Sequence, residues 1–350
     1  MTGPHVPLRL RLDGAALLSN WRWLAANSGA AACGAAVKAD GYGLGARAVV
    51  QRLRRAGVRD FFVATWAEAH AVSDLVEPGS LSVLHGVGPD DLPYASRSPS
   101  RPVLNTAEQV RRWRETGRPC DVMIDTGMNR LGLSVEEVQA GVLDGLNIHT
   151  LMSHLACADE PGHSLNARQR DRFRAVAAAV KSERLSLANS AGICLGSDYA
   201  FDLTRPGLAL YGGIPMRDDG AQQRALKPVA AIEAQVLQVR RVLAGQSVGY
   251  SATFVAPSDL NVAIINLGYA DGYLRLLGRA GHALAGDVRC PIRGVVSMDL
   301  IALEVPEGVT VGEGDWLSLP LDLPVLSAAA GLTQYELLTG LSDRFERRWT

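Results

Sequence analysis

The chain has 350 residues, of which 47% are hydrophobic and 20% charged, and its formal net charge is −1 at pH 7. This length predicts two domains, or one large barrel with an appendage, and the composition is that of a globular protein with a sizeable core. The balanced charge disfavours a polyanion-binding protein, so we expect no nucleic-acid or membrane partner.

The N-terminus and the cysteines indicate the cellular setting. Residues 1–14 contain no long apolar core, and no later stretch approaches ~20 uninterrupted apolar residues, so we expect a cytoplasmic protein. The cysteines are widely spaced and include no CxxC pair, which favours buried thiols over a disulfide or zinc framework. They are Cys33, Cys120, Cys157, Cys194 and Cys290.

The N-terminal half alternates between strand and helix signals. Leu8, Leu10 and Leu12 alternate with arginines, which predicts a half-buried strand, and Asp13 is placed to cap a helix through Leu17–Leu24. Strand-like apolar runs follow at Ala35–Lys38, Phe61–Thr65, Leu81–Leu84, Val103–Leu104, Val122–Asp125, Ile148–His154, Leu185–Asn189 and Phe201–Thr204. Helical patterns between them include Ala46–Arg55, Thr106–Glu115, Val135–Ala140 and Asn166–Lys181.

This alternation ends near Leu226-Lys227-Pro228. About eight βα units over roughly 200 residues fit a closed parallel barrel better than an open sheet. We therefore predict an α/β fold: a (β/α)8 barrel over residues 1–225, then a mainly antiparallel β domain over 226–350. The first strand, about 8–12, is a candidate to pack with the β domain. The β-rich runs are Val229–Val242, Val262–Leu267 and Val288–Val305, and helical spacing returns at Val325–Ala330 and Gln334–Leu341.

Polar residues follow several predicted barrel strands, where the chemistry of such a fold gathers. Lys38 stands between an apolar run and a glycine-rich loop, and a partly desolvated lysine there suits Schiff-base chemistry. Arg130 can form a two-pronged bond to a carboxylate. Each also has a plain structural interpretation: an exposed lysine, an arginine capping a loop, and, for His154, a hydrogen-bonded core histidine.

Two glycine-containing stretches predict a phosphate site. LANSAG, residues 187–192, offers backbone N–H groups and a hydroxyl, and RPGLALYGG, residues 205–213, has a glycine that permits close approach of a ligand. An ordinary helix cap is the alternative. In the β domain, Tyr250 in VGYSATF, the tyrosines of GYADGY, and SMDL after a long strand are further candidates, although edge packing is the default for tyrosine.

Together, these stretches resemble alanine racemases, a family of pyridoxal 5′-phosphate enzymes, from about residue 8 to the last helix. The resemblance implies a barrel and a β domain in a head-to-tail homodimer with composite active sites. It also implies interconversion of L-alanine and D-alanine, with D-alanine supplied to the bacterial cell wall. The motifs that carry it, in order, are AVKADGYGLG, DTGMNRLG, SHLACAD, LANSAG, RPGLALYG, LKPV, VGYSATF, GYADGY, SMD and TQYELLTGL.

The same resemblance implies a two-base mechanism on a pyridoxal 5′-phosphate aldimine. Lys38 would hold the cofactor and act on the D-enantiomer, and Tyr250 of the partner subunit would act on the L-enantiomer from the opposite face. Each base needs its pKa lowered by roughly 3 units, which a cation-rich, partly dry site can supply. Arg205 is expected to face the pyridine nitrogen and keep it unprotonated.

The remaining roles are also implied by the resemblance. Arg130 and the backbone N–H of Met298 of the partner subunit would receive the substrate carboxylate, and Tyr269 with Tyr335 would narrow the pocket. Asp299 is expected to order its loop. The cofactor-binding set is Lys38, Tyr42, His154, Asn189, Ser190, Arg205, Gly207, Leu208 and Tyr335.

Two positions depart from a common family pattern. Met123 stands where many relatives have a lysine that becomes carbamylated and braces the arginine. Because an unpaired buried cation is costly, we expect an anion such as chloride, or the amide of Asn129, beside Arg130. Ser186 stands where some relatives place a histidine behind the one that corresponds to His154, which affects tuning rather than activity.

Three rival functions stay open. A racemase with broader or different side-chain specificity would share all these motifs, and a biosynthetic role is not separated from a catabolic one. A decarboxylase with the same two domains predicts a catalytic cysteine motif in the β domain, but Cys290 has no such setting. A non-catalytic pyridoxal phosphate carrier would need only the barrel.

Overall fold

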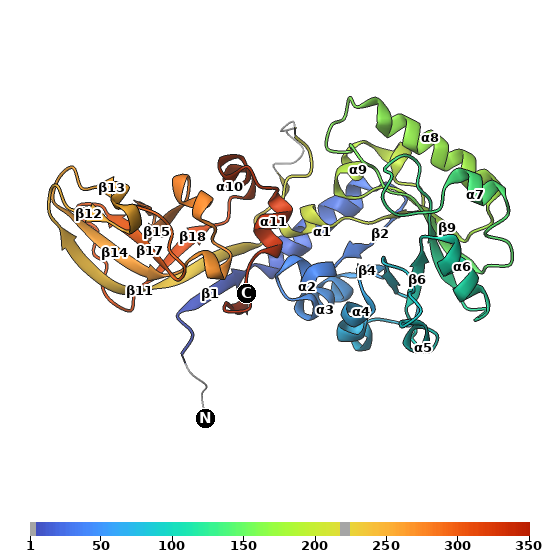
Figure 1. The fold of residues 1–350 in the computed structure, drawn as a ribbon, viewed down its shortest axis with the longest axis horizontal. Helices are drawn as coiled ribbons and strands as arrows, with labels where there is room; N and C mark the ends of the chain where they lie inside the picture. The colour runs from blue at the N-terminus through green and yellow to red at the C-terminus, as the bar shows by residue number, and fades with distance from the viewer. Residues whose placement is uncertain (1–4, 218–224) are drawn as a thin grey trace. The chain divides into compact units, whose positions relative to one another are not determined.

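The structure is a computed structural model that describes residues 5–217 and 225–350 (Figure 1). The chain divides into two compact units. One is Leu17–Lys227, and the other combines the N-terminal residues through Ala16 with Pro228–Thr350. None of the helices in the described ranges has the length and apolar character needed to cross a membrane.

The first unit is built of short parallel strands and the helices between them. The strands are β2 (Ala32–Cys33), β3 (Ala35–Ala36), β4 (Phe61–Val63), β5 (Leu81–Val83), β6 (Arg101–Leu104), β7 (Cys120–Met123), β8 (Ile148–Met152), β9 (Arg184–Ser186) and β10 (Leu203–Thr204). The helices are α1 (Gly14–Asn27), α2 (Lys38–Tyr42), α3 (Ala46–Ala56), α4 (Trp66–Val72), α5 (Leu92–Ala95), α6 (Ala107–Arg114), α7 (Val135–Gln139), α8 (Ser164–Ala179) and α9 (Ser190–Cys194).

Strands β3 to β9 pair in sequence order, and hydrogen bonds through β10 close the ring. The Ala32 N–H donates to Asp202 O at 2.9 Å, and the Ala36 N–H donates to Pro206 O at 2.9 Å. On the other side of β10, the Arg205 N–H donates to Ala188 O at 2.8 Å. Because β2 and β3 share one position, the nine strands β2–β10 fill eight positions, and the predicted barrel is confirmed.

The sequence patterns explain these elements. Strands β4 to β7 are buried at every position, as expected for a parallel sheet covered on both faces. Helix α3 buries Ala46, Val49, Val50 and Leu53, which form one stripe at helical spacing. Burying such an aliphatic side chain contributes about 1.5–3 kcal/mol. The predicted cap of α1 is also confirmed, because Asp13 Oδ1 accepts the Ala16 N–H at 2.8 Å.

The second unit is mainly antiparallel, as predicted. Its strands are β1 (Leu8–Leu12), β11 (Ala230–Val242), β12 (Ser247–Val248), β13 (Phe254–Val255), β14 (Leu260–Asn266), β15 (His282–Ala285), β16 (Val288–Pro291), β17 (Leu300–Val305), β18 (Trp316–Pro320) and β19 (Glu346–Trp349). Its helices are α10 (Leu323–Ala330) and α11 (Gln334–Thr339). The long strand β11 pairs with β1 and β18, and beyond an irregularity at Val236/Gln238 with β14. Strand β1 also pairs with β19 in parallel.

Two expectations were wrong. SMDL does not follow a long strand, because within the β-rich run Val288–Val305 strand β16 ends at Pro291, Gly294 turns the chain with φ 73°, and β17 begins only at Leu300. A side chain at Gly294 would meet Val248 O at 2.6 Å, so only glycine fits this turn. The cysteines are all free, as expected, but only Cys120 and Cys290 are buried, while the other three are partly exposed.

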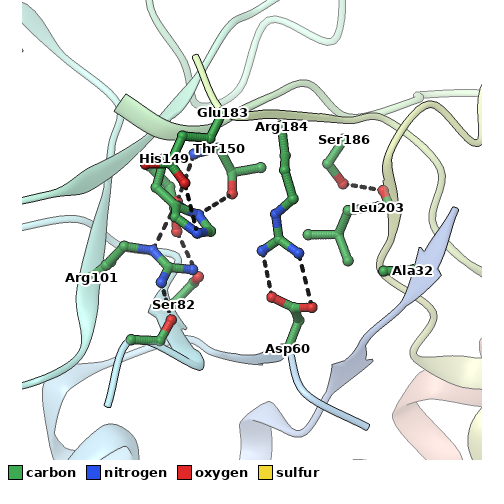
Figure 2. Close-up of polar contacts among 12 residues, drawn as sticks. Ala32, Asp60, Ser82, Arg101, His149, Thr150, Glu183, Arg184, Ser186 and Leu203 are labelled. Atoms are coloured by element: carbon green, nitrogen blue, oxygen red, sulfur yellow. Dashed lines mark hydrogen bonds and ion pairs between the residues drawn. The ribbon is translucent and has the colours of Figure 1, made fainter. Parts of the chain in front are cut away.

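A polar cluster occupies the N-terminal half of the barrel strands, opposite the end where the predicted site residues lie (Figure 2). Its centre is the fully buried carboxylate of Asp121 on β7. Asp121 accepts hydrogen bonds from Ser82 Oγ at 2.6 Å, Arg101 Nε at 3.1 Å and the Thr150 N–H at 3.0 Å. Beside it, Arg184 makes a two-pronged bond to Asp60, at 3.1 and 2.5 Å. The cluster joins five barrel strands through their polar side chains.

Candidate active site

Lys38 lies two residues past the end of β3 and is half-buried. Burial lowers its pKa, and the nearby positive charge of Arg130 lowers it further, while the carboxylate of Glu68 acts in the opposite direction. A lysine in this setting loses its proton more easily than an exposed one. The interpretation of Lys38 as a fully exposed surface lysine is therefore wrong.

Next to Lys38, the structure forms a small polar cradle from three distant segments. Ser190 Oγ is buried and accepts the Gly207 N–H at 2.9 Å and the Ala209 N–H at 3.2 Å. In the described part of the chain we find no acceptor for the Ser190 hydroxyl hydrogen. The ring of Tyr42 stacks on Tyr211 with centroids 4.6 Å apart.

Gly207 is what lets the Tyr42 hydroxyl enter this cradle. A side chain at Gly207 would place its Cβ 2.1 Å from Tyr42 Oη, so the space a Cβ would fill is occupied by the hydroxyl. Tyr42, Ser190 and Gly207 are thereby brought together, with Leu208 buried beside them. Asn189 has a simpler role, because its Oδ1 accepts the Gly192 N–H at 2.8 Å as the cap of α9.

Arg205, Arg130 and Lys38 lie close enough to His154 for their charges to act on its imidazole. Arg205 is buried and donates to Ser153 O at 2.6 Å and to Ser186 Oγ. Burial lowers the pKa of Arg205 to about 10, so the guanidinium stays protonated at neutral pH. Burial, with the charges of Arg205, Arg130 and Lys38, lowers the pKa of His154 to about 3, which makes its imidazole neutral. A cation-rich, partly dry site was expected, and these residues form one.

Arg130 is exposed in the single chain, so the burial that motivated a partner for it is not seen there. An anion beside Arg130 stays a prediction. Within residues 5–217 and 225–350, no hydrogen bond joins it to Asn129 and no carboxylate pairs with it. Met123 is buried and apolar. The Ser186 hydroxyl donates to Leu203 O at 2.5 Å (Figure 2). It also accepts a hydrogen bond from Arg205, so it supports the guanidinium.

The other predicted residues, Tyr250, Tyr269, Met298 and Tyr335, lie in the second unit, and all four are exposed in the single chain. Tyr250 is 70% exposed in the turn between β12 and β13, where Ser251 and Ala252 have positive φ values of 59° and 46°. A turn with left-handed backbone thus holds the Tyr250 side chain in solvent in the single chain.

The SMD stretch is a loop packed on GYADGY rather than the end of a strand. The Tyr269 N–H donates to Ser297 O and the Ala270 N–H to Met298 O, both at 3.0 Å. In the described residues, the Met298 N–H has no acceptor. Asp299 accepts a bond from Arg344 at 2.8 Å, which is the loop-ordering role expected of it.

Sequence reasoning missed two carboxylates. Glu68 lies close to Lys38, and the pattern Thr65-x-x-Glu68 is a visible capping-box signal. Asp121 is an acidic residue inside a fully buried strand. This position by itself indicates a polar cluster, because a buried carboxylate needs hydrogen-bonding or charged partners. Neither pattern reveals which distant group the carboxylate contacts.

Two family models match this chain, and their matched residues correspond closely to the two units. The family model for the N-terminal domain of alanine racemase matches residues 12–215, and the one for its C-terminal domain matches residues 229–349. The alanine racemase of Methylobacterium nodulans is 40% identical over 360 residues, which cover 97% of this chain and 95% of the relative. Agrobacterium fabrum has two similar proteins: a catabolic alanine racemase, 42% identical over 97% of this chain and 91% of its own, and a biosynthetic one, 38% identical over 99% and 94%.

Solved structures of alanine racemases are also similar to this chain over nearly its whole length. Alanine racemase from Bartonella henselae, described with covalently bound pyridoxal phosphate, has a TM-score of 0.89 and 34% identity, over 99% of this chain and 100% of that chain. Similarity over both units, together with the lysine at the C-terminal end of the barrel, places the protein among the amino-acid racemases. The chain belongs to the alanine racemase family.

Proposed function

We propose that the protein interconverts L-alanine and D-alanine with pyridoxal 5′-phosphate held at the C-terminal end of the barrel. The observation that carries this is the half-buried Lys38, with its lowered pKa, in the barrel of a chain from this family. The covalently bound pyridoxal phosphate of the Bartonella henselae relative supports covalent attachment of the cofactor. Lys38 would be the residue that holds it here.

The barrel residues fit this cofactor. Lys38 would bind it through Nζ, and Ser190, Gly207 and Tyr42 would hold the phosphate in the cradle, with Tyr335 and Leu208 as further contacts. When bound, pyridoxal phosphate supplies an electron-withdrawing ring that makes the Cα–H of an attached amino acid acidic. Arg205 would hold the ring with a guanidinium that stays protonated.

Two groups would move the proton. Lys38 can accept and return the proton because the pKa of its amine is lowered toward neutral pH. Tyr250 is the proposed base on the opposite face and would reach the site of a second copy of the chain in a homodimer. Its exposure in the single chain supports this, since the side chain is available to another protomer.

The substrate carboxylate would bind between Arg130 and the Met298 N–H of the partner subunit. Arg130 has no carboxylate partner among the described residues, so its two-pronged face is free for one. The anion predicted beside Arg130 could occupy this place when substrate is absent. Tyr269 would help to narrow the pocket to a methyl-sized side chain. The cytoplasmic location and the supply of D-alanine to the cell wall stay predictions.

The test uses one protein sample. We expect a visible absorbance band, trapping of the cofactor on Lys38 by borohydride as read by peptide mass spectrometry, and formation of D-alanine from L-alanine. A panel of other L-amino acids separates alanine from broader specificity, and carbon dioxide release would indicate the decarboxylase. A yellow protein that borohydride reduces but that shows no racemase activity would support the proposed cofactor and contradict the proposed function.

Replacing Gly207 with alanine should weaken cofactor binding. The new Cβ would lie 2.1 Å from Tyr42 Oη, so the hydroxyl must leave the cradle. Overpacking of this kind costs about 1–3 kcal/mol, or roughly 5- to 150-fold in the dissociation constant measured by absorbance titration. Gly162→Ala is the control, because a Cβ at Gly162 meets nothing within 4 Å. Equal affinities of the two variants would contradict this prediction.

A further inference from the structure

The residues directly after Lys38 form a left-handed turn. The φ angles of Ala39, Asp40, Gly41 and Tyr42 are 52°, 50°, 64° and 56°. Left-handed backbone is unfavourable for residues other than glycine, and three of these four residues are not glycine. Such a turn persists only where its surroundings hold it in place.

One clamp on this turn comes from Glu68 on α4. Its Oε1 accepts the Ala39 N–H at 2.8 Å, and its Oε2 accepts the Ala64 N–H at 2.6 Å. Ala64 directly follows β4, which pairs with β3, the strand that leads to Lys38. One carboxylate therefore ties the residue after Lys38 to the neighbouring barrel strand.

Glu68 differs in this respect from other glutamates at the same helical position. Glu137 and Glu336 also complete capping boxes, and each accepts the N–H of its own cap residue, at 2.8 and 2.7 Å. The corresponding distance from Glu68 to the Thr65 N–H is 3.4 Å. The short hydrogen bonds of Glu68 are those from Ala39 and Ala64. Its carboxylate therefore stabilises the turn after Lys38 more than it caps its own helix.

We propose that Glu68 is a positioning residue for Lys38, which holds the turn after the lysine and places one negative charge beside the lysine amine. This proposal rests on the proposed role of Lys38. The charged and titratable groups that act on Lys38 come from three elements: Arg130 after β7, His154 after β8, and Glu68 on α4. Burial and the positive charge of Arg130 lower the pKa of Lys38, and His154 is neutral. The carboxylate of Glu68 raises this pKa and so acts against both.

Glu68→Gln tests this, with Glu137→Gln as the matched control in the same unit. The amide keeps the size of the side chain, but it loses the charge and one of the two acceptors. In the full chain freed of cofactor, we expect the midpoint for acetylation of Lys38, read by peptide mass spectrometry against pH, to fall by about 0.5–1 unit. The uptake of pyridoxal phosphate should slow about 3- to 10-fold. Glu137→Gln should change neither quantity.

Glu68→Asp separates the two parts of the role and serves also if Glu68→Gln does not fold. It keeps the charge but has a shorter reach, so the acetylation midpoint should return toward wild type while cofactor uptake stays slow. If Glu68→Gln and Glu68→Asp both match Glu137→Gln in the two measurements, Glu68 is only a helix cap and the proposal is overturned. Failure of borohydride to trap the cofactor on Lys38 in the wild type would instead reject the proposed function, and the acetylation midpoint would still report on Glu68.

Discussion

Mixing Lys38→Ala protomers with Tyr250→Phe protomers should restore racemisation that neither variant shows alone. Each substitution removes one of the two proton-transferring groups, and we expect each to lower kcat at least ~10³-fold. Tyr250→Phe should still bind pyridoxal phosphate, because the cradle and Lys38 lie in the barrel unit. Lys38→Ala should lose the trapped cofactor as well.

The amount restored follows from the composite site. After random exchange of subunits, about half of the dimers are mixed, and each mixed dimer has one complete site of two, so about one quarter of the wild-type activity should return. Mixing Lys38→Ala with the double variant Lys38→Ala/Tyr250→Phe should restore nothing. If Tyr250 served the site of its own chain, the first mixture would also stay inactive, and the head-to-tail arrangement would be excluded.

Asp121→Ala should be the most destabilising single substitution in the barrel interior. The carboxylate is fully buried, and its removal leaves Arg101, which is itself buried, without its ion pair. Breaking a buried pair in this way costs about 3–5 kcal/mol of the free energy of unfolding, which urea titration measures. Asp74→Ala, which breaks the exposed pair with Arg47, is the control and should have a much smaller effect.

The pH dependence of the same variant checks the cause. Burial raises the pKa of Asp121, but Arg101, His149 and Ser82 outweigh it and hold the pKa below its usual range. The carboxylate therefore stabilises the fold fully above pH ~4, and this contribution is lost as the pH falls through the lowered pKa. The difference between wild type and Asp121→Ala should shrink in acid. A difference that stays constant from neutral pH down to pH ~3 would mean that packing, not charge, is responsible.

The local order of the chain was predictable because parallel strands and amphipathic helices have short-range signatures. The fully buried strands and the helix at Ala46–Ala56 follow from apolar runs and from spacing along a few residues. The place of Lys38 just past a strand, and of Arg205 past the last one, follows from the same patterns. The long strand expected before SMDL failed for a matching reason, since Gly294 is required by contact with Val248, which is distant in sequence.

What the sequence alone determined is therefore the family, the two-part fold and the residues that end barrel strands, all of which depend on motif order and local periodicity. Tertiary structure decided the rest. Only folding brings the Ser190 hydroxyl into hydrogen-bonding distance of the Gly207 N–H, leaves Arg130 exposed in the single chain, and directs Glu68 to the turn after Lys38. These contacts join residues from separate strand ends, and a hydrogen bond between distant segments leaves no periodic pattern in the chain.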